Sequence, residues 1–486
     1  MTFSKTYFAI YDFEILPYAL GDALTWNVQT SLRCEEAGRE KVDILILTDP
    51  RYPSSIYQRD LVFSENAPLF FNELLGAFGT HPLLGNIHIF RTREELLAWL
   101  SGVAKDDPVT REVVDDYEKV IAGRENSDVL NEYFIKYIYS HGRINQFFEK
   151  NGRVPLLAAS RGCEPDVDSI IANAFGGKKV VVIHPRLRRL DAGLKGEHTH
   201  FRDSDFLTWY EFLHGAIEKY PDVQFVVVGR LQEKPISLLR LPNVTNLRTM
   251  GLGLGHELTL MLKSDLFIGT SSGFAALANF SELPYFITRM NKESYNAYNI
   301  SEGDERLPFS TPKQFLVSGD ETIKMLTGML EQGLQAARRS SSIGASRATE
   351  LDGKAFAQGQ DDALNNFATT SRFFIDDLQA DQEIASLIET RVTEAIEAAA
   401  AGDLVSARRT YERLVTLFPQ LVGRHKHLDF LRNAKKSPVR KVGHNVRNAL
   451  TPAVTIINKV KKSVDRGTLG EDVTRKVSRI VSRGKR

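Results

Sequence analysis

The segment Ser264–Ala278 reads SDLFIGTSSGFAALA. Its first half contains Leu266–Gly269, a short apolar run with the length of a buried strand. Small hydroxyl and glycine residues follow, and Gly273–Phe280 is an alanine-rich stretch that favours a helix. A buried strand that passes through a tight connection into a helix is typical of parallel α/β layers.

The same alternation of strand and helix extends on both sides of this segment. Near the start of the chain, a strand, a helix and a strand are expected at Tyr7–Ile10, Ala23–Ala37 and Val42–Thr48, which implies a parallel crossover. Further strands are expected at Ile87–Phe90, Val180–Ile183, Gln224–Gly229, Val244–Leu247 and Tyr285–Ile287, and further helices within Thr92–Phe148 and at Phe206–Tyr220 and Glu257–Lys263. We therefore predict two Rossmann-like, doubly wound α/β domains, in residues 1–175 and 176–333, whose strand ends face a ligand crevice.

The rest of the chain has a different composition. Residues 334–380 are small and polar, and we expect a linker with a return helix. Residues 381–434 contain apolar positions in an order similar to one tetratricopeptide helix pair. Because one such repeat cannot bury its own apolar face, we expect a docking pair or a helical element that supports a homo-oligomer.

The net charge of the 486 residues is +1, but the charges are segregated. Residues 435–486 hold 15 basic and three acidic side chains, or +12, while the other residues hold 47 basic and 58 acidic ones, or −11. Apolar residues recur in this tail every three or four positions, which predicts a basic amphipathic helix on an anionic membrane surface. A disordered or core-docked tail is the alternative, and nucleic acid is not expected because the tail has no aromatic residue.

Other features of composition point to a cytoplasmic protein. The two cysteines, Cys34 and Cys163, lie far apart, so neither a disulfide framework nor a zinc ribbon is expected. No stretch of about 18 apolar residues is free of charge, and the first residues lack the pattern of a signal peptide. Together with the basic tail, this predicts a cytoplasmic protein held peripherally at the inner face of the membrane.

Gly21-Asp22 lies where the first strand passes into the first helix. Gly21 permits a tight turn of the backbone. The Asp22 carboxylate either caps the helix or faces the crevice, where it would act as a general base on a hydroxyl nucleophile.

A basic cluster follows the strand at Val180–Ile183. The sequence from His184 to Asp191 is HPRLRRLD, with Arg186, Arg188 and Arg189, and Lys195 follows it. Arginine offers a rigid, bidentate fork for phosphate, so the cluster is suited to a diphosphate leaving group. A solvated basic loop is the alternative.

Three further groups of residues are candidates for ligand binding. Thr270, Ser271, Ser272 and Gly273 place hydroxyls and backbone N–H groups at the start of a helix, which favours an anion or a sugar. Gly229-Arg230 ends a strand, and Glu257 follows a glycine-rich turn, where it either binds a ribose hydroxyl or belongs to an ordinary turn. Neither a dinucleotide-binding GxGxxG motif nor a Walker A motif is present.

These motifs resemble those of GT-B glycosyltransferases. SDLFIGTSSGFAALA is similar to the stretch by which heptosyltransferases and the fucosyltransferase superfamily bind a nucleotide diphosphate. HPRLRRLD is similar in placement to the fucosyltransferase basic motif, although the arginine pair falls two residues later, at Arg188-Arg189. Gly21-Asp22 resembles the Gly-Asp of heptosyltransferases, which implies that Asp22 is the catalytic base.

The resemblance and the residue chemistry together predict a metal-independent, inverting glycosyltransferase of bacterial surface-polysaccharide synthesis. Its donor is a nucleotide sugar and its acceptor is a glycan or a lipid-linked glycan. No cofactor or metal is expected, because no Asp-x-Asp pair stands in a loop after a strand and the arginines would neutralise the diphosphate. A nonhydrolysing sugar-nucleotide epimerase and a catalytically silent scaffold with the same fold are the alternatives.

Overall fold

The computed structural model describes most of the first 336 residues and a few beyond them. The described residues are 5–49, 51, 62, 67–104, 106–138, 141–186, 202–230, 234, 236–336, 394–395, 398, 403, 406–407 and 410–411. The chain divides into two compact units, Met1–Phe374 and Ile375–Arg486. Each unit is described by itself.

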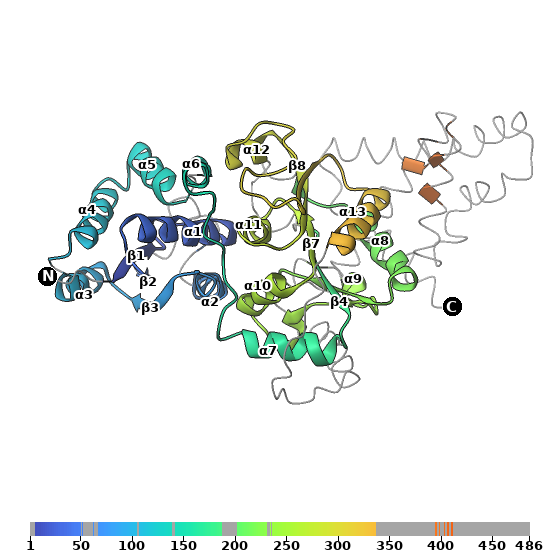
Figure 1. Cartoon of the computed structure of the whole chain (residues 1–486), viewed down its shortest axis with the longest axis horizontal. Helices are drawn as coiled ribbons and strands as arrows, with labels where there is room; N and C mark the ends of the chain where they lie inside the picture. The colour runs from blue at the N-terminus through green and yellow to red at the C-terminus, as the bar shows by residue number, and fades with distance from the viewer. Residues whose placement is uncertain are drawn as a thin grey trace, which may run out of the picture. The chain divides into compact units, whose positions relative to one another are not determined.

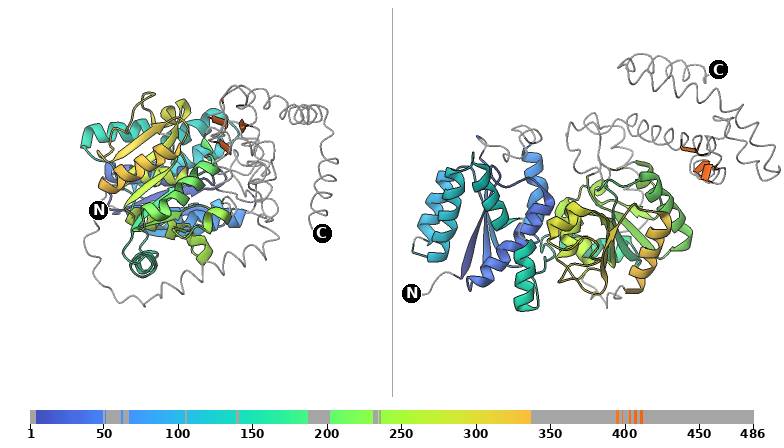
Figure 2. Two further views of the ribbon diagram at one scale, coloured as in Figure 1. Left: turned by 90° about the vertical axis from the view of Figure 1, so that its right-hand side faces the viewer. Right: turned by 90° about the horizontal axis from the view of Figure 1, so that it is seen from above.

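The first unit begins with a parallel sheet of three strands. These are β1 (Thr6–Asp12), β2 (Lys41–Leu47) and β3 (Leu84–Phe90), in the order β1-β2-β3. β1 is buried along its whole length, as expected for a parallel strand with helices on both faces (Figure 2).

Helices follow each of these strands (Figure 1). They are α1 (Leu20–Glu36), α2 (Ala67–Phe78), α3 (Arg93–Ala104), α4 (Pro108–Ala122), α5 (Ser127–Tyr137) and α6 (His141–Asn151), and then α7 (Glu164–Ser169), which continues into a short π-helical segment at Ile170–Ala174. Local sequence sets several of these ends. Asp107 caps α4 by accepting a hydrogen bond from the Thr110 N–H, and Pro108 occupies the first helical position, where no N–H is needed.

A second parallel sheet follows, with six strands. They are β4 (Lys179–His184), β5 (Val223–Val227), β6 (Val244–Thr245), β7 (Leu266–Thr270), β8 (Tyr285–Met290) and β9 (Gln314–Ser318). Their order in the sheet is β6-β5-β4-β7-β8-β9, so the chain winds outward from β4 in one direction and from β7 in the other. Numbered within this domain, the order is 3-2-1-4-5-6, the Rossmann arrangement.

Six α-helices connect or follow these strands. They are α8 (Phe206–Lys219), α9 (Ile236–Leu239), α10 (Leu254–Lys263), α11 (Gly273–Asn279), α12 (Lys292–Tyr298) and α13 (Ile323–Ala336), and a 3₁₀ turn covers Leu247–Met250. The predicted α/β fold class is confirmed, and the strands expected in both halves are present. β9 and α13 complete the second domain and were not predicted from the sequence.

The two sheet domains touch through helices that approach each other closely. A Cβ atom at Gly76 of α2 would lie 2.4 Å from the backbone nitrogen of Gly255 in α10. Only glycine fits at such a crossing, because real Cβ atoms do not come this near to backbone. Beside it, the Arg248 guanidinium bridges Glu73 of α2 and Glu257 of α10, at 2.8 Å from each carboxylate.

In the second unit, the described residues are few. Residues 394–395, 398, 406–407 and 410–411 are helical, and Asp403 between them accepts a hydrogen bond from the Ser406 N–H at 3.0 Å. Ala395, Ala407 and Tyr411 are buried. The remainder of the predicted helix pair, the linker and the basic tail lie outside the described residues. Within the described part of the chain, no helix is long and apolar enough to cross a membrane.

Candidate active site

The strand order of the second sheet locates the candidate site. Between β4 and β7 the direction of winding reverses, and open α/β sheets bind ligands outside the carboxyl ends of the strands at this point. β4 ends at His184 and β7 ends at Thr270, and Gly229 follows β5 at the same edge. Three of the motifs predicted from sequence therefore meet at one edge of the sheet.

The start of α1 brings a residue of the first domain to this edge. A Cβ atom at Gly273, the first residue of α11, would lie 2.8 Å from the Cβ of Leu20 and 3.0 Å from the nitrogen of Gly21. The two helices therefore meet backbone to backbone at their N-terminal ends. Asp22 follows directly, in the same first turn of α1.

Asp22 does not cap α1. The N-cap residue is Ala19, which offers no side-chain hydrogen bond, and Asp22 is the third residue of the helix. Asp22 is partly buried, and no hydrogen bond or ion pair joins its carboxylate to another residue in the described part of the chain. Burial raises the pKa of Asp22 to about 7, against the opposing attraction of Arg202. Of the two roles predicted for Asp22, helix capping is therefore not seen, and the crevice-facing role stays a prediction.

His184 and Ser272 form a pair across β4 and α11. Ser272 is the N-cap residue of α11, yet its hydroxyl lies 3.0 Å from Nδ1 of His184 instead of capping the helix. His184 is buried, and burial, Lys234 and Arg186 hold its pKa well below the usual range. His184 is therefore a neutral partner that orients the Ser272 hydroxyl, and it does not supply a positive charge.

The hydroxyls predicted next to Ser272 differ in exposure. Thr270 is fully buried, and its hydroxyl has no hydrogen-bond partner among the described residues. Ser271 is also buried, its N–H donating to the Thr288 carbonyl at 3.3 Å. Ser272 and Gly273 are only partly buried, so these two residues are the ones with surface available to a ligand.

The basic cluster is only partly within the described residues. Arg186 forms an ion pair with Asp203 at 3.6 Å, and its N–H donates to the Ser204 hydroxyl at 3.3 Å. Arg188, Arg189 and Lys195 lie outside the described residues, so the structure does not test their predicted role.

Two cations that sequence reasoning missed lie at the same edge. Arg202 donates to the Ser271 carbonyl at 3.4 Å, and its charge opposes the rise that burial causes in the pKa of Asp22. Lys234 is almost completely buried and donates to the Pro185 carbonyl at 2.9 Å. Both residues lie in polar segments whose sequence has neither helical nor strand periodicity. Only their neighbours in the tertiary structure distinguish them from ordinary surface cations.

Gly229, Arg230 and Glu257 lie around the end of β5. Gly229 has a φ of 108°, and a Cβ there would lie 3.3 Å from Nζ of Lys234 and 3.5 Å from Nε2 of His184. Its N–H donates to Glu257 at 3.1 Å. Glu257 is completely buried, and burial raises its pKa to about 7 although Arg248 opposes the shift. Glu257 therefore holds the end of β5 and has no exposed oxygen for a ribose in this structure.

Arg230 faces the first domain. Its guanidinium lies 4.7 Å from the centre of the Phe70 ring in α2, within the range of a cation–π contact. Elsewhere, no group of three or more His, Cys, Asp or Glu side chains among the described residues is placed to hold a metal ion.

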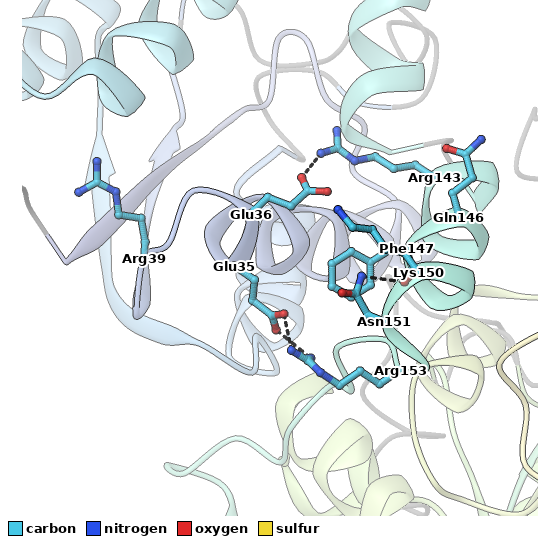
Figure 3. Close-up of a pocket in the computed structure, with 9 residues that line it drawn as sticks. All are labelled: Glu35, Glu36, Arg39, Arg143, Gln146, Phe147, Lys150, Asn151 and Arg153. Atoms are coloured by element: carbon cyan, nitrogen blue, oxygen red, sulfur yellow. Dashed lines mark hydrogen bonds and ion pairs between the residues drawn. The ribbon is translucent and has the colours of Figure 1, made fainter.

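A cavity of about 950 Å³ lies at the other end of α1. Its lining residues are Glu35, Glu36, Arg39, Arg143, Gln146, Phe147, Lys150, Asn151 and Arg153. Figure 3 shows that Arg143 pairs with Glu36 and Arg153 with Glu35 across it. A 17-residue helix is about 25 Å long, so this cavity is separate from the edge where Asp22 lies.

Comparisons with known proteins found only remote likenesses. No family model and no curated protein matches the chain. Among solved structures, a glycosyl transferase family 9 protein from Veillonella parvula is similar over 75% of this chain and 99% of its own, with 9% identity and a TM-score of 0.36. The E. coli ADP-heptose lipopolysaccharide heptosyltransferase II is similar over 68% of this chain and 99% of its own, with 14% identity and a TM-score of 0.37. A Listeria monocytogenes protein assigned as a UDP-N-acetylglucosamine 2-epimerase is similar over 77% of this chain and 97% of its own, with 11% identity and a TM-score of 0.32. TM-scores this low carry no argument about this chain.

The buried carboxylate of Asp22 predicts a pH-dependent effect on stability. Its pKa is higher in the folded than in the unfolded state, so folding stability falls as the pH rises from about 4 to about 7. We expect Asp22→Asn to raise the free energy of unfolding at pH 8 by on the order of 2 kcal/mol, with a gain that disappears towards pH 4. Urea unfolding of both proteins at pH 8 and at pH 4 measures this difference in the free energy of unfolding. Asp128→Asn, at an exposed acid in the first turn of α5, is the control, and a gain of equal size there would contradict the assignment.

Proposed function

We propose that this chain is a glycosyltransferase that moves a sugar from a nucleotide-sugar donor to a hydroxyl of a glycan or lipid-linked acceptor. One observation carries the proposal. The start of α1, which carries Asp22, meets the start of α11 at the switch point of a Rossmann sheet, and Arg202 donates to the carbonyl of Ser271 just before α11. A carboxylate and a cation on opposite sides of one crevice suit a reaction that removes a proton from one reactant and releases an anion from the other.

Asp22 would act as the general base. With a pKa near 7 and no partner in the described part of the chain, its carboxylate is able to accept a proton at neutral pH. The acceptor hydroxyl loses this proton as its oxygen attacks the anomeric carbon, while the bond from that carbon to the diphosphate oxygen breaks. Because Asp22 comes from the domain opposite the donor-binding sheet, attack from the face away from the diphosphate inverts the anomeric configuration.

Arginine side chains would stabilise the departing diphosphate. Arg202 and Arg186 lie beyond the carboxyl ends of β7 and β4, and Arg188, Arg189 and Lys195 of the same loop would add to them. Fixed cations aimed at oxygens that gain negative charge lower the energy of the transition state. With these groups the transfer needs no metal ion. The neutral His184 would fix the Ser272 hydroxyl as a hydrogen-bond donor to a phosphate oxygen.

The role of Asp22 predicts the pH dependence of turnover. For the wild-type protein, kcat/KM should rise as the pH passes through about 7, because the base works only when it is ionised. Asp22→Asn should lower kcat by roughly 10²- to 10⁴-fold, abolish this rise and leave donor affinity unchanged. Product release from a nucleotide-sugar donor, measured with a glycan acceptor, tests the rate, and calorimetry tests the affinity. Normal turnover by Asp22→Asn would exclude it as the base.

The diphosphate contacts predict losses of donor affinity. Arg202→Gln, Arg186→Ala and Arg188→Ala should each weaken nucleotide-sugar binding about tenfold or more, because each removes a hydrogen bond to a charged group. A thermal-shift screen of nucleotide sugars identifies the donor, and calorimetry then compares the variants. Arg153→Gln, an arginine paired with Glu35 beside the distant cavity, is the matched control. Equal affinities for all the variants would reject the cation assignment.

We also propose that residues 435–486 hold the enzyme peripherally on the anionic inner face of the cytoplasmic membrane, where lipid-linked acceptors of surface polysaccharides are found. The support is the segregated charge, +12 in the tail against −11 elsewhere. Basic side chains near an anionic leaflet contribute about 1 kcal/mol each.

The tail proposal predicts salt-sensitive membrane binding. Full-length protein should float with vesicles that contain phosphatidylglycerol, and a variant that ends at Asn433 should stay in the dense fraction. Vesicles of phosphatidylcholine alone are the control, since they offer no negative surface. Equal flotation of the shortened and full-length proteins with anionic vesicles would refute the anchor.

A further inference from the structure

The first turn of α2 is apolar although solvent reaches it. Residues 67–71 read APLFF, with no polar side chain. Pro68 is exposed, Leu69 is 67% exposed, and Phe70 and Phe71 are partly buried. Single exposed apolar residues are common on protein surfaces, but a contiguous group of them marks a binding surface. This turn is therefore a candidate binding surface of the first domain.

The turn lies on the side of α2 that faces the second domain. Leu69, Glu73 and Gly76 share one helix face, because they are spaced by four and three residues. Gly76 meets the backbone of α10, which lies beside α2 (Figure 1), and Glu73 forms an ion pair with Arg248 at 2.8 Å. One turn nearer the helix start, Leu69 is open to solvent. Leu69 therefore lies where the contact between the two domains ends.

Aromatic rings connect this turn with the start of α1. The Tyr18 ring stacks on Phe13, with 4.0 Å between the ring centroids, and meets Phe70 edge-on, with 6.1 Å between the centroids. Tyr18 lies just before α1, the helix that carries Asp22. An apolar layer of the first domain therefore extends from the start of α1 to Leu69.

Arg230 of the second domain adds a positive charge to this surface. It follows Gly229 beyond the end of β5 and is partly buried, with its guanidinium 4.7 Å from the centre of the Phe70 ring. In the part of the chain that the structure describes, this guanidinium forms no ion pair or hydrogen bond. By contrast, Arg248, which also reaches α2, is bonded to two carboxylates. The charge of Arg230 is therefore not neutralised by a described acid and is suited to an anionic ligand.

The two parts of this surface match one kind of ligand. Pro68 and Leu69 are aliphatic, so they suit a hydrocarbon chain, which leaves water when it packs on them. The planar guanidinium of Arg230 matches a phosphate. A hydrocarbon chain joined to a phosphate presents both groups side by side. A nucleobase would instead stack on aromatic faces, and the most exposed residues of this turn are aliphatic.

The position of the surface favours the acceptor over the donor. Arg202, a proposed contact of the donor diphosphate, donates to the Ser271 carbonyl beyond β7. Arg230 follows β5, which lies on the other side of β4 from β7. Leu69 belongs to the first domain, which also carries Asp22, the proposed base for the acceptor hydroxyl.

We propose that Leu69, Phe70 and Arg230 bind the lipid part of the acceptor. The hydrocarbon chain packs on Leu69 and Phe70, and the phosphate that joins this chain to the acceptor sugar binds to Arg230. The inference rests on the proposed function and narrows its acceptor to a sugar that is linked through phosphate to a hydrocarbon chain.

Calorimetry with farnesyl phosphate, below the concentration at which it aggregates, tests the site in the full chain. Leu69→Ser should weaken binding about fivefold or more, because the chain loses apolar contact area. Arg230→Gln should weaken it about tenfold or more, because the phosphate loses a charged hydrogen-bond donor. Both variants should keep the wild-type affinity for the nucleotide sugar. The melting temperature of Leu69→Ser should not change, since this side chain is exposed.

Ile135→Ser is the matched control. Ile135 is 60% exposed on α5, so this variant also removes an exposed aliphatic side chain, and its affinity for farnesyl phosphate should equal that of the wild type. The basic tail is present in all of these proteins, so a difference between them does not come from the tail.

The outcomes separate this site from the proposed function. Equal affinities of the wild type, Leu69→Ser and Arg230→Gln for farnesyl phosphate would overturn the site. So would an Arg230→Gln variant that binds the nucleotide sugar more weakly and farnesyl phosphate normally, since Arg230 would then belong to the donor. A wild-type protein that binds nucleotide sugars and not farnesyl phosphate would reject the site and leave the proposed function standing. Binding of farnesyl phosphate that both variants weaken, without binding of any nucleotide sugar, would keep the lipid-phosphate site and reject the proposed function.

Discussion

The contact between the first turns of α1 and α11 is the constraint on which the candidate site depends. Gly273 lets the two helices meet at a distance that a side chain at this position would prevent. This contact brings the helix turn that carries Asp22 against the start of α11 in the second sheet domain. The Gly76–Gly255 crossing and the Arg248 bridge form another contact between the same two domains, so the geometry of the crevice is held at more than one point.

Burial shifts the pKa values of the titratable side chains at this edge toward their neutral forms. His184 stays neutral because burial and two neighbouring cations disfavour its protonated form, and it is left to orient a hydroxyl. Burial raises the pKa of Asp22 to about 7, and Arg202 opposes the shift. Arg186, Arg202 and Lys234 supply the positive charge from separate loops. In the proposed transfer, these groups would hold an anion on one side and remove a proton on the other.

Much of the fold and part of the site could be predicted from the sequence. Apolar runs such as Val180–Ile183 and Leu266–Gly269 indicate strands because both faces of a parallel sheet are buried. Gly21-Asp22, HPRLRRLD and GTSSG stood out because glycine, arginine and hydroxyl residues directly after a strand lie at the ligand edge. β9 was missed because its apolar run, Phe315–Val317, is only three residues long and polar residues flank it. Glu257 was predicted as a candidate ligand contact because it follows a glycine-rich turn. Its burial against Arg248 could not be predicted, because Arg248 lies outside the helix of Glu257.

The sequence by itself determined the order of most strands and helices, the parallel α/β class and the segregation of charge between body and tail. The strands and helices depend on residues close together in the chain, since each element must bury its own apolar face. The segregation of charge is a property of composition alone. Only the tertiary structure decided that Asp22 does not cap α1, that Arg202 acts on its carboxyl and that Lys234 is buried. These features arise from packing between segments that are up to 180 residues apart, which local sequence patterns do not record.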